Sequence, residues 1–355
     1  MNKKINLFLL LFLLLLLISF VPHNNSVWAE SSGNFSSSTA EIIMEVKSKR
    51  ILHQKNINEK KYMASTTKIL TAITVIENCS LNEIVTVNKK TTGIEGSSIY
   101  LKEGEKLTIK DLLYGLMLRS GNDCAETLAH HVSGSNEEFA TLMNQTAKKI
   151  GVNNSHFVNP HGLHDDNHYT TAYDLGLISC YAMNNDDFRE IVSTKKTTIP
   201  NDKNDYDRVL INKNKILSML EGANGIKTGF TKKAGRCLVS SAKRNGLELV
   251  CVVLNCPPMF ERSKNLLDDS FGQYKNYKLV ESDHVIDFID GENGKIPIGI
   301  NDDIVLPLTE SEYNNISIKF EYPSNISNIN DKEIGKVKIF IKNNLIFTEK
   351  IYIIV

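Results

Sequence analysis

A serine and a lysine three residues apart give the first sign of chemistry in this chain. Residues 65–68, Ser-Thr-Thr-Lys, open an apolar run. On a helix, residues three apart share a face, so the Lys68 amine can reach the Ser65 hydroxyl. A serine needs a base to act as a nucleophile, and a lysine serves when burial and nearby positive charge lower its pKa below about 10.4. The same spacing recurs at Ser193/Lys196 and Ser240/Lys243.

A second pattern, Ser120-Gly121-Asn122, follows a helix expected over residues 108–118. The Ser120 hydroxyl could relay a proton, and the Asn122 amide could hold a substrate carbonyl. Taken alone, Ser120 is equally well explained as a turn between two helices. Ser-x-Asn also occurs at Ser32, Ser80 and Ser263.

The third pattern, Lys227-Thr228-Gly229, occurs once. It precedes a predicted hairpin, so we expect it on or next to a strand whose edge could face Ser65. A lysine ammonium and a threonine hydroxyl suit a carboxylate, and glycine allows a substrate backbone to approach closely. Taken alone, the Lys-Thr-Gly pattern is equally well explained as the ordinary start of a strand with a basic residue before a glycine.

The order of the three patterns narrows the choice. A serine–lysine site of this kind needs Ser-x-x-Lys, then Ser-x-Asn, then Lys-Thr-Gly, and no Ser-x-Asn lies between Ser193 and Lys227. Ser65 therefore remains as the nucleophile, and Ser120 fits the helix-end context better than Ser80.

Together, these motifs resemble those of the penicillin-recognising serine enzymes. Their flanks look more specifically like the low-molecular-mass penicillin-binding proteins that are D-alanyl-D-alanine carboxypeptidases. The resemblance covers roughly residues 38–260, and the segment after it resembles the domain that follows in this family. The matching stretches are residues 63–64, 120–123, 159–163, 168–175 and 225–231.

The resemblance implies a mechanism without metal or cofactor. Ser65 would attack the carbonyl between the two terminal D-alanines of a peptidoglycan stem peptide, Lys68 would take its proton, and Ser120 would pass one to the leaving D-alanine. A β-lactam antibiotic would acylate the same serine. The expected substrate-binding residues are Asn122, Lys227, Thr228, Gly229 and Phe230.

The surrounding pattern predicts an α/β (α+β) fold of the serine-transpeptidase/β-lactamase type over residues 40–272. Strands are expected at 40–46, 51–53, 235–243 and 247–255, the last two joined at Asn245-Gly246. Capping signals predict helices that begin near Thr108, Ser135 and Thr171.

Residues 273–355 predict a small all-β sandwich domain, because short β-type runs alternate with Asn, Asp and Gly and show no helical period. The runs are 284–289, 295–300, 304–308, 316–322, 337–341 and 345–355.

The first residues predict export. Lys3 and Lys4 precede an apolar run over 7–21, and a cleavage site with small residues follows, ending at Ala29. This is the order of a signal peptide, which we expect over 1–29. Residues 30–39 are expected to form a linker. An uncut membrane anchor is the alternative. Either way the protein would lie outside the cytoplasmic membrane, in the cell wall or on the membrane's outer face. The strand-like end at 351–355 differs from the family's amphipathic anchor, so tight membrane attachment is expected only if the leader is retained, and peripheral association is the other expectation.

Composition narrows the class of protein further. The 355 residues carry 41 basic and 41 acidic groups and are 41% hydrophobic. That balance excludes a disordered chain, a multi-span membrane protein and a nucleic-acid binder.

The six cysteines predict free, mostly buried thiols rather than a disulfide framework. In the simplest hairpin register Cys251 faces Ser240, so Cys237 and Cys251 point to opposite faces of the sheet. No Cys-x-x-Cys or Cys/His spacing indicates zinc, and Cys124 is expected to be a packing residue.

Three other classes of protein share parts of this pattern. A class A β-lactamase needs a Glu-bound water for deacylation, and no Glu lies between Glu138 and Glu190. A non-catalytic cell-wall-binding homologue should have lost a motif residue, yet all are intact. A metal peptidase is suggested by a cluster whose spacing is not His-Glu-x-x-His, so we favour a structural or substrate-lining loop. The cluster is His161, His164, Asp165, Asp166 and His168.

Overall fold

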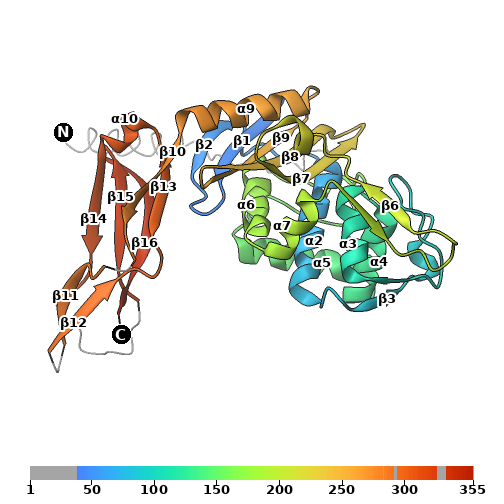
Figure 1. Ribbon diagram of the computed structural model, residues 1–355, viewed down its shortest axis with the longest axis horizontal. Helices are drawn as coiled ribbons and strands as arrows, with labels where there is room; N and C mark the ends of the chain where they lie inside the picture. Colours follow the sequence, from blue (N-terminus) through green and yellow to red (C-terminus); the bar gives the residue numbers. More distant parts are fainter. Residues whose placement is uncertain (1–37, 283, 292–293, 326–332, 355) are drawn as a thin grey trace, which may run out of the picture. The chain divides into compact units, whose positions relative to one another are not determined.

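A five-stranded antiparallel sheet forms the centre of the first part of the protein in a computed structural model (Figure 1). The structure describes residues 38–282, 284–291, 294–325 and 333–354. The strand order β2-β1-β9-β8-β7 leaves β7 at one edge. The strands are β1 (Ala40–Glu45), β2 (Ile51–Lys55), β7 (Ala223–Thr231), β8 (Gly235–Arg244) and β9 (Leu247–Leu254).

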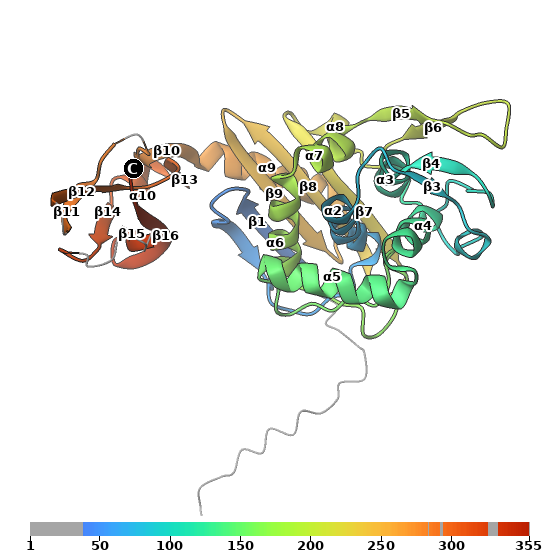
Figure 2. The same cartoon turned by 90° about the horizontal axis from the view of Figure 1, so that it is seen from below.

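Apolar side chains on both faces of this sheet account for its position inside the molecule. Along β1, Ile42 and Met44 belong to one core while Ile43 belongs to another, as the two-residue period of a strand requires. The helix α9 (Met259–Gln273) packs on β8 and β9 at one face. The helices between residues 68 and 193 cover the opposite face (Figure 2).

The helices on that opposite face begin at the predicted caps. Thr108 and Asp111 form a reciprocal capping box at α3 (Ile109–Leu118), while Ser135 and Thr171 cap α5 (Asn136–Ile150) and α6 (Ala172–Met183). All three predictions are confirmed. The remaining helical elements of this part are η1 (Ala64–Thr67), α2 (Lys68–Asn78), η2 (Lys89–Thr91), α4 (Asn122–Ser133), α7 (Asp186–Ser193) and α8 (Ile216–Met219).

Two short hairpins at the edge of the helical layer were not predicted. Strand β3 (Ile84–Thr86) pairs with β4 (Lys106–Thr108), and β5 (Lys196–Ile199) pairs with β6 (Arg208–Ile211). Three- and four-residue strands carry too few side chains to show a clear alternation.

The region after residue 274 is β-rich, as predicted. A two-stranded sheet, β10-β13, and a five-stranded sheet, β11-β12-β16-β15-β14, share one apolar core. The prediction missed β10 and the one-turn helix α10, which a Thr309–Glu312 capping box begins. The elements are β10 (Lys275–Val280), β11 (Asp287–Gly291), β12 (Gly294–Gly299), β13 (Ile304–Leu308), α10 (Glu310–Tyr313), β14 (Ile316–Glu321), β15 (Glu333–Ile341) and β16 (Asn344–Ile353).

The predicted leader at 1–29 lies outside the described residues, as does most of the predicted linker. Within the part of the chain that the structure describes, no helix has the length and apolar character needed to cross a membrane.

Candidate active site

Ser65 lies in a tight helical turn that leads into α2. The turn is a 3-10 helix over residues 64–67, in which the Thr66 backbone nitrogen donates to the Met63 carbonyl at 3.3 Å. The hydroxyls of Thr66 and Thr67 also donate back, to the carbonyls of Met63 and Ala64, at 2.7 and 2.8 Å. The α-helix proper begins three residues later than the sequence predicted, at Lys68. Ser65 itself is partly exposed.

Lys68 is fully buried and its amine is the centre of the site. Nζ lies 3.3 Å from Ser65 Oγ, 2.7 Å from Asn122 Oδ1 and 2.6 Å from the carbonyl oxygen of His161. Burial, followed by the charge of Lys227, lowers the pKa of Lys68 well below its usual value. A neutral amine can accept the proton of a nearby hydroxyl.

Ser120 and Asn122 lie where α3 ends and α4 begins. Ser120 is buried and adopts a left-handed φ of 65°, so the chain reverses here as expected. The Asn122 side chain is oriented at both ends: Oδ1 accepts from Lys68, and Nδ2 donates to the Glu95 carbonyl at 2.6 Å. The second motif therefore meets the first through the Asn122 amide.

The third motif lies on the edge strand β7, next to the turn that carries Ser65. A Cβ atom at Gly229 would lie 3.1 Å from the backbone nitrogen of Ser65 and 3.0 Å from the Met63 carbonyl. A Cβ atom here would meet backbone atoms more tightly than ordinary van der Waals contact, so glycine favours this close approach of β7. The prediction of a strand whose edge faces Ser65 is confirmed.

The side chains of the Lys-Thr-Gly strand differ in exposure. Lys227 is buried, and its Nζ donates to the Thr228 carbonyl at 3.0 Å. Phe230 is 60% exposed and lies under the Arg236 guanidinium, whose Cζ is 5.6 Å from the ring centroid. Burial and then the charge of Lys213 lower the pKa of Lys227 to about 7.

Lys213 is a site residue that the sequence reasoning missed. Its Nζ donates to Ser97 Oγ at 3.2 Å, and its charge lowers the pKa of both Lys227 and Lys68. It lies in no motif that we recognised; the signal available was a lysine in an Asn-Lys-Asn turn shortly before the Lys-Thr-Gly strand.

Asp123 lies in the matching stretch 120–123, and the sequence alone predicts no role for it. Its buried carboxylate accepts from Ser98 Oγ at 2.6 Å and from the backbone nitrogens of Ile99 and Leu101 at 3.1 and 3.0 Å. It thus fixes a loop beside the site through backbone contacts.

The histidine- and aspartate-rich loop is structural where it meets the site. His168 lies between Thr67 Oγ1, 2.7 Å away, and the Val158 nitrogen, 3.0 Å away. His161 Nε2 lies 3.1 Å from Glu126 Oε1. Burial lowers the pKa of His168 to about 3, so its ring stays neutral. These contacts support the interpretation of a lining loop over a metal peptidase.

Gly162 allows this loop to lie against the nucleophile's turn. It adopts φ 86°, and a Cβ atom there would lie 2.0 Å from the Ala64 carbonyl oxygen. Any other residue would therefore push the loop off the turn.

All six cysteines are free, as predicted. Cys251 pairs in register with Ser240, which confirms the expected opposite faces. Cys124 is fully buried against Gly115, where a Cβ atom would lie 2.6 Å from its sulfur. Its role is packing.

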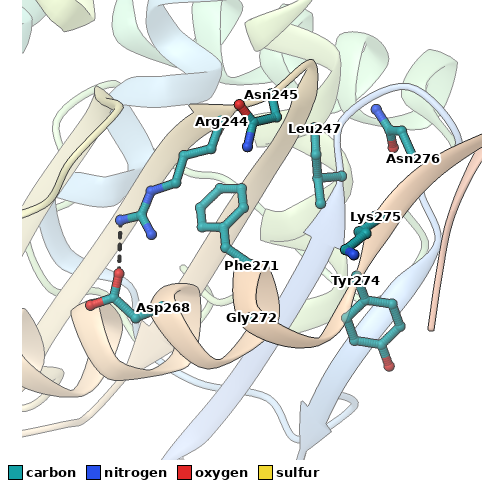
Figure 3. A pocket seen from close by; sticks show the side chains of 9 residues that line it. All are labelled: Arg244, Asn245, Leu247, Asp268, Phe271, Gly272, Tyr274, Lys275 and Asn276. Atoms are coloured by element: carbon teal, nitrogen blue, oxygen red, sulfur yellow. Dashed lines mark hydrogen bonds and ion pairs between the residues drawn. The ribbon is translucent and has the colours of Figure 1, made fainter. Parts of the chain in front are cut away.

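A separate pocket of about 470 Å³ lies between the β8–β9 hairpin and the end of α9 (Figure 3). In it the Arg244 guanidinium covers the Phe271 ring, with Cζ 4.6 Å from the centroid, and pairs with Asp268 at 2.7 Å. No predicted site residue lines this pocket, so it is distinct from the candidate active site.

This fold, with three motifs meeting around a buried lysine, defines the class of penicillin-binding, β-lactamase-like proteins. Residues 28–257 match the peptidase S11 family, described as D-alanyl-D-alanine carboxypeptidase, and the chain belongs to that family. Residues 274–354 match the C-terminal domain of penicillin-binding protein 5.

Individual relatives agree with this assignment. The D-alanyl-D-alanine carboxypeptidase DacF of Bacillus subtilis is 30% identical over 294 residues, which are 79% of this chain and 75% of the relative. The DacA enzyme of Haemophilus influenzae is 28% identical over 300 residues, 79% and 74% of the two chains. The crystal structure of penicillin-binding protein 5 from Haemophilus influenzae matches with a TM-score of 0.76 at 25% identity, covering 89% of this chain and 96% of the other. These matches confirm the predicted carboxypeptidase function, which was the alternative to a class A β-lactamase.

Proposed function

We propose that the protein removes the terminal D-alanine from peptidoglycan stem peptides through an acyl-enzyme on Ser65. The observation that carries this proposal is the 3.3 Å hydrogen bond between Lys68 Nζ and Ser65 Oγ. The lysine is fully buried, with its pKa well below the usual value. The base that a serine nucleophile needs therefore lies beside Ser65, in surroundings that favour loss of its proton.

Acylation forms one bond and breaks another. Ser65 Oγ attacks the carbonyl carbon between the two D-alanines, and its proton passes to Lys68. When the tetrahedral intermediate collapses, the C–N bond breaks and the Ser120 hydroxyl gives its proton to the leaving amino group. Ser120 regains a proton from protonated Lys68, which returns to its starting state. The departing product is D-alanine, and the shortened peptide remains as an ester on Ser65.

Backbone N–H groups of Ser65 and Phe230 are the proposed oxyanion hole. The close approach of Gly229 to the Ser65 nitrogen supports this assignment, because it brings the two backbone segments together. Such donors are worth about 3–4 kcal/mol in the transition state.

The remaining motif residues bind the substrate in this proposal. Lys227 and Thr228 hold the terminal carboxylate, since an ammonium and a hydroxyl form charge-assisted hydrogen bonds to it. Asn122 positions the peptide. Water then hydrolyses the ester and restores the Ser65 hydroxyl. A β-lactam antibiotic presents a reactive amide to the same hydroxyl and should remain attached.

We further infer how the chain is divided and where it acts. Residues 1–29 would be a signal peptide, 30–39 a linker, 40–272 the catalytic domain and 273–355 the C-terminal β domain. The leader pattern supports export, to the cell wall or the outer face of the cytoplasmic membrane. The proposal includes peripheral association with that membrane, which membrane fractionation would test.

Release of D-alanine from a synthetic pentapeptide tests the proposal. Wild type should release it, and Ser65→Ala should lose at least about a thousandfold in rate, as removal of a nucleophile does in other serine hydrolases. Ser193→Ala is a matched control, because Ser193 also has a lysine three residues on. Penicillin labelling without any D-alanine release would overturn the carboxypeptidase assignment and favour a wall-binding homologue.

A further inference from the structure

Three side chains that commonly bind metals gather at the far ends of two active-site helices. Cys79 is the residue at which α2 ends, Glu83 directly precedes β3, and His131 lies in the last turn of α4. Their sulfur, carboxylate oxygen and ring nitrogen atoms all lie within 4.8 Å of one another. Within the described ranges no other group of three such residues meets this criterion.

The cluster is distinct from the candidate active site. Cys79 follows Lys68 by eleven positions along α2, which is about 16 Å of helix at 1.5 Å per residue. Asn122 and His131 likewise lie near opposite ends of α4. No residue of the cluster takes part in the proposed mechanism.

We propose that Cys79, Glu83 and His131 form a Zn²⁺ site with water as the fourth ligand. Thiolate, imidazole and carboxylate are the three ligand types that zinc accepts in proteins, and four ligands in a tetrahedron are its usual arrangement. Calcium and magnesium take oxygen ligands instead, so the sulfur favours zinc over these hard cations.

The distances are compatible with this ion after a small adjustment. His131 Nε2 lies 2.9 Å from Glu83 Oε1. Bonds of about 2.0–2.2 Å at a tetrahedral angle would set these atoms about 3.4 Å apart. The two side chains are 24% and 46% exposed, so the required opening of about half an ångström displaces only side chains with room to move.

The backbone around the cluster is held in place, which a pre-formed site needs. The Cys79 nitrogen donates to Val75, and the Glu83 nitrogen donates to Ser80, both at 3.0 Å. The Glu83 carbonyl in turn accepts from Ile109 at 3.0 Å, which ties the segment to the start of α3. Two helices end at the site, and helix C-termini favour a positive charge.

Charge balance also favours a divalent cation. When Zn²⁺ binds, the S–H proton leaves to solvent and an S–Zn bond forms. The thiolate and the carboxylate then carry two negative charges, which offset the two positive charges of the ion.

A bound ion would join the ends of α2 and α4, whose first residues are Lys68 and Asn122. Because zinc would bind the folded chain, it would stabilise the fold in proportion to its occupancy. The spacing of residues 79, 83 and 131 matches no zinc motif, so the sequence predicted no metal.

Thiol labelling of the wild-type protein provides a direct test. Cys79 is partly exposed whereas the other five cysteines are buried, so a maleimide reports on Cys79. The chain is first freed of metal with a chelator and then titrated with zinc chloride alone. At about ten times the dissociation constant, roughly one site in eleven stays empty, so labelling should slow about tenfold. A labelling rate that zinc leaves unchanged would overturn the proposal.

Three variants identify the ligands by isothermal titration with zinc chloride. Wild type should bind one ion per chain, and Cys79→Ser and His131→Ala should lose saturable binding. His130→Ala is the matched control, since His130 is the preceding residue on α4 and is 26% exposed against 24% for His131. Full binding in the first two variants, or loss in the control, would contradict the site.

Circular dichroism establishes that each variant is folded, and if one is not, the wild-type labelling experiment decides alone. Because all readouts are zinc binding rather than D-alanine release, failure here leaves the proposed catalytic function untouched.

Discussion

The helical and sheet region that carries the active site differs from the C-terminal β region in what it buries. In the first, Lys68, Lys227 and Asp123 are 2% exposed or less. In the second, every described residue that is buried after residue 274 is apolar or glycine, and the ion pairs lie at the surface. Burying a charge costs free energy unless partners compensate it.

The difference shows that buried ionisable side chains, with their cost in free energy, are found in the region of the active site. Lys68 has three polar partners within 3.3 Å, and its pKa shift is the chemical result. Among its described residues, the C-terminal region has no buried ionisable side chain. We therefore expect changes in the first region to alter chemistry and changes in the second to alter stability alone.

The largest effect on chemistry is expected for Lys68→Ala. Removing the base should lower the rate of acylation by about 10²–10⁴-fold. The measurement is the rate of covalent labelling by a fluorescent penicillin, with melting temperature as the control. Labelling within threefold of wild type would show that another group is the base.

A smaller loss is expected for Lys227→Gln. The substitution removes a charge-assisted contact to the substrate carboxylate, worth about 1.5–3 kcal/mol, so kcat/KM should fall roughly 10- to 150-fold. A pentapeptide amide, which lacks the terminal carboxylate, serves as the control because its rate should change little. Equal losses on both substrates would contradict a carboxylate-binding role.

The dependence of kcat/KM on pH tests the role of Lys227. With a pKa of about 7 for Lys227 in the free enzyme, its charge is present below pH 7 and lost above it. We expect kcat/KM to fall as the pH rises through 7. The fall in kcat should come at higher pH, because a bound carboxylate keeps Lys227 protonated. The Gln variant should lack the alkaline fall in kcat/KM, and its persistence there would assign that fall to another group.

No effect on chemistry is expected for Ile339→Ala in the C-terminal region. Ile339 is fully buried, and its truncation should cost about 2–5 kcal/mol of stability while D-alanine release from a soluble peptide stays unchanged. Thermal melting and the release assay measure the two. The exposed Lys319 provides a control, with a change from Lys319→Ala within about 0.5 kcal/mol. If folded Ile339→Ala released no D-alanine, the C-terminal region would contribute to the chemistry, which contradicts the distinction between the two regions.

The sequence predicted those site residues whose role depends on side-chain type and local spacing. Ser65 and Lys68 are three apart on one helical turn. Asn122 follows a helix whose start is marked by the capping signal of Thr108 and Asp111. Their meeting with Lys227 depends on β7 forming an edge strand beside the turn, a long-range pairing that the order of motifs indicated but local periodicity does not contain.

The missed parts act through the backbone or across long separations. Asp123 fixes a loop by accepting from Ile99 and Leu101, and the His161 carbonyl accepts from Lys68. The residue type does not indicate such a contact, because every residue has a backbone carbonyl and nearly every residue has a backbone N–H group. Helix α9 was missed because its charged outer face obscures the apolar positions that pack on the sheet, such as Leu266 and Leu267.

The most direct test of the central claim is to locate the covalent bond that the active site forms. Intact mass spectrometry after incubation with benzylpenicillin should show one adduct per chain, and peptide mapping should place it on Ser65. The Ser65→Ala variant should show no adduct. An adduct on another residue, or full D-alanine release by a protein that lacks the Ser65 hydroxyl, would contradict the account.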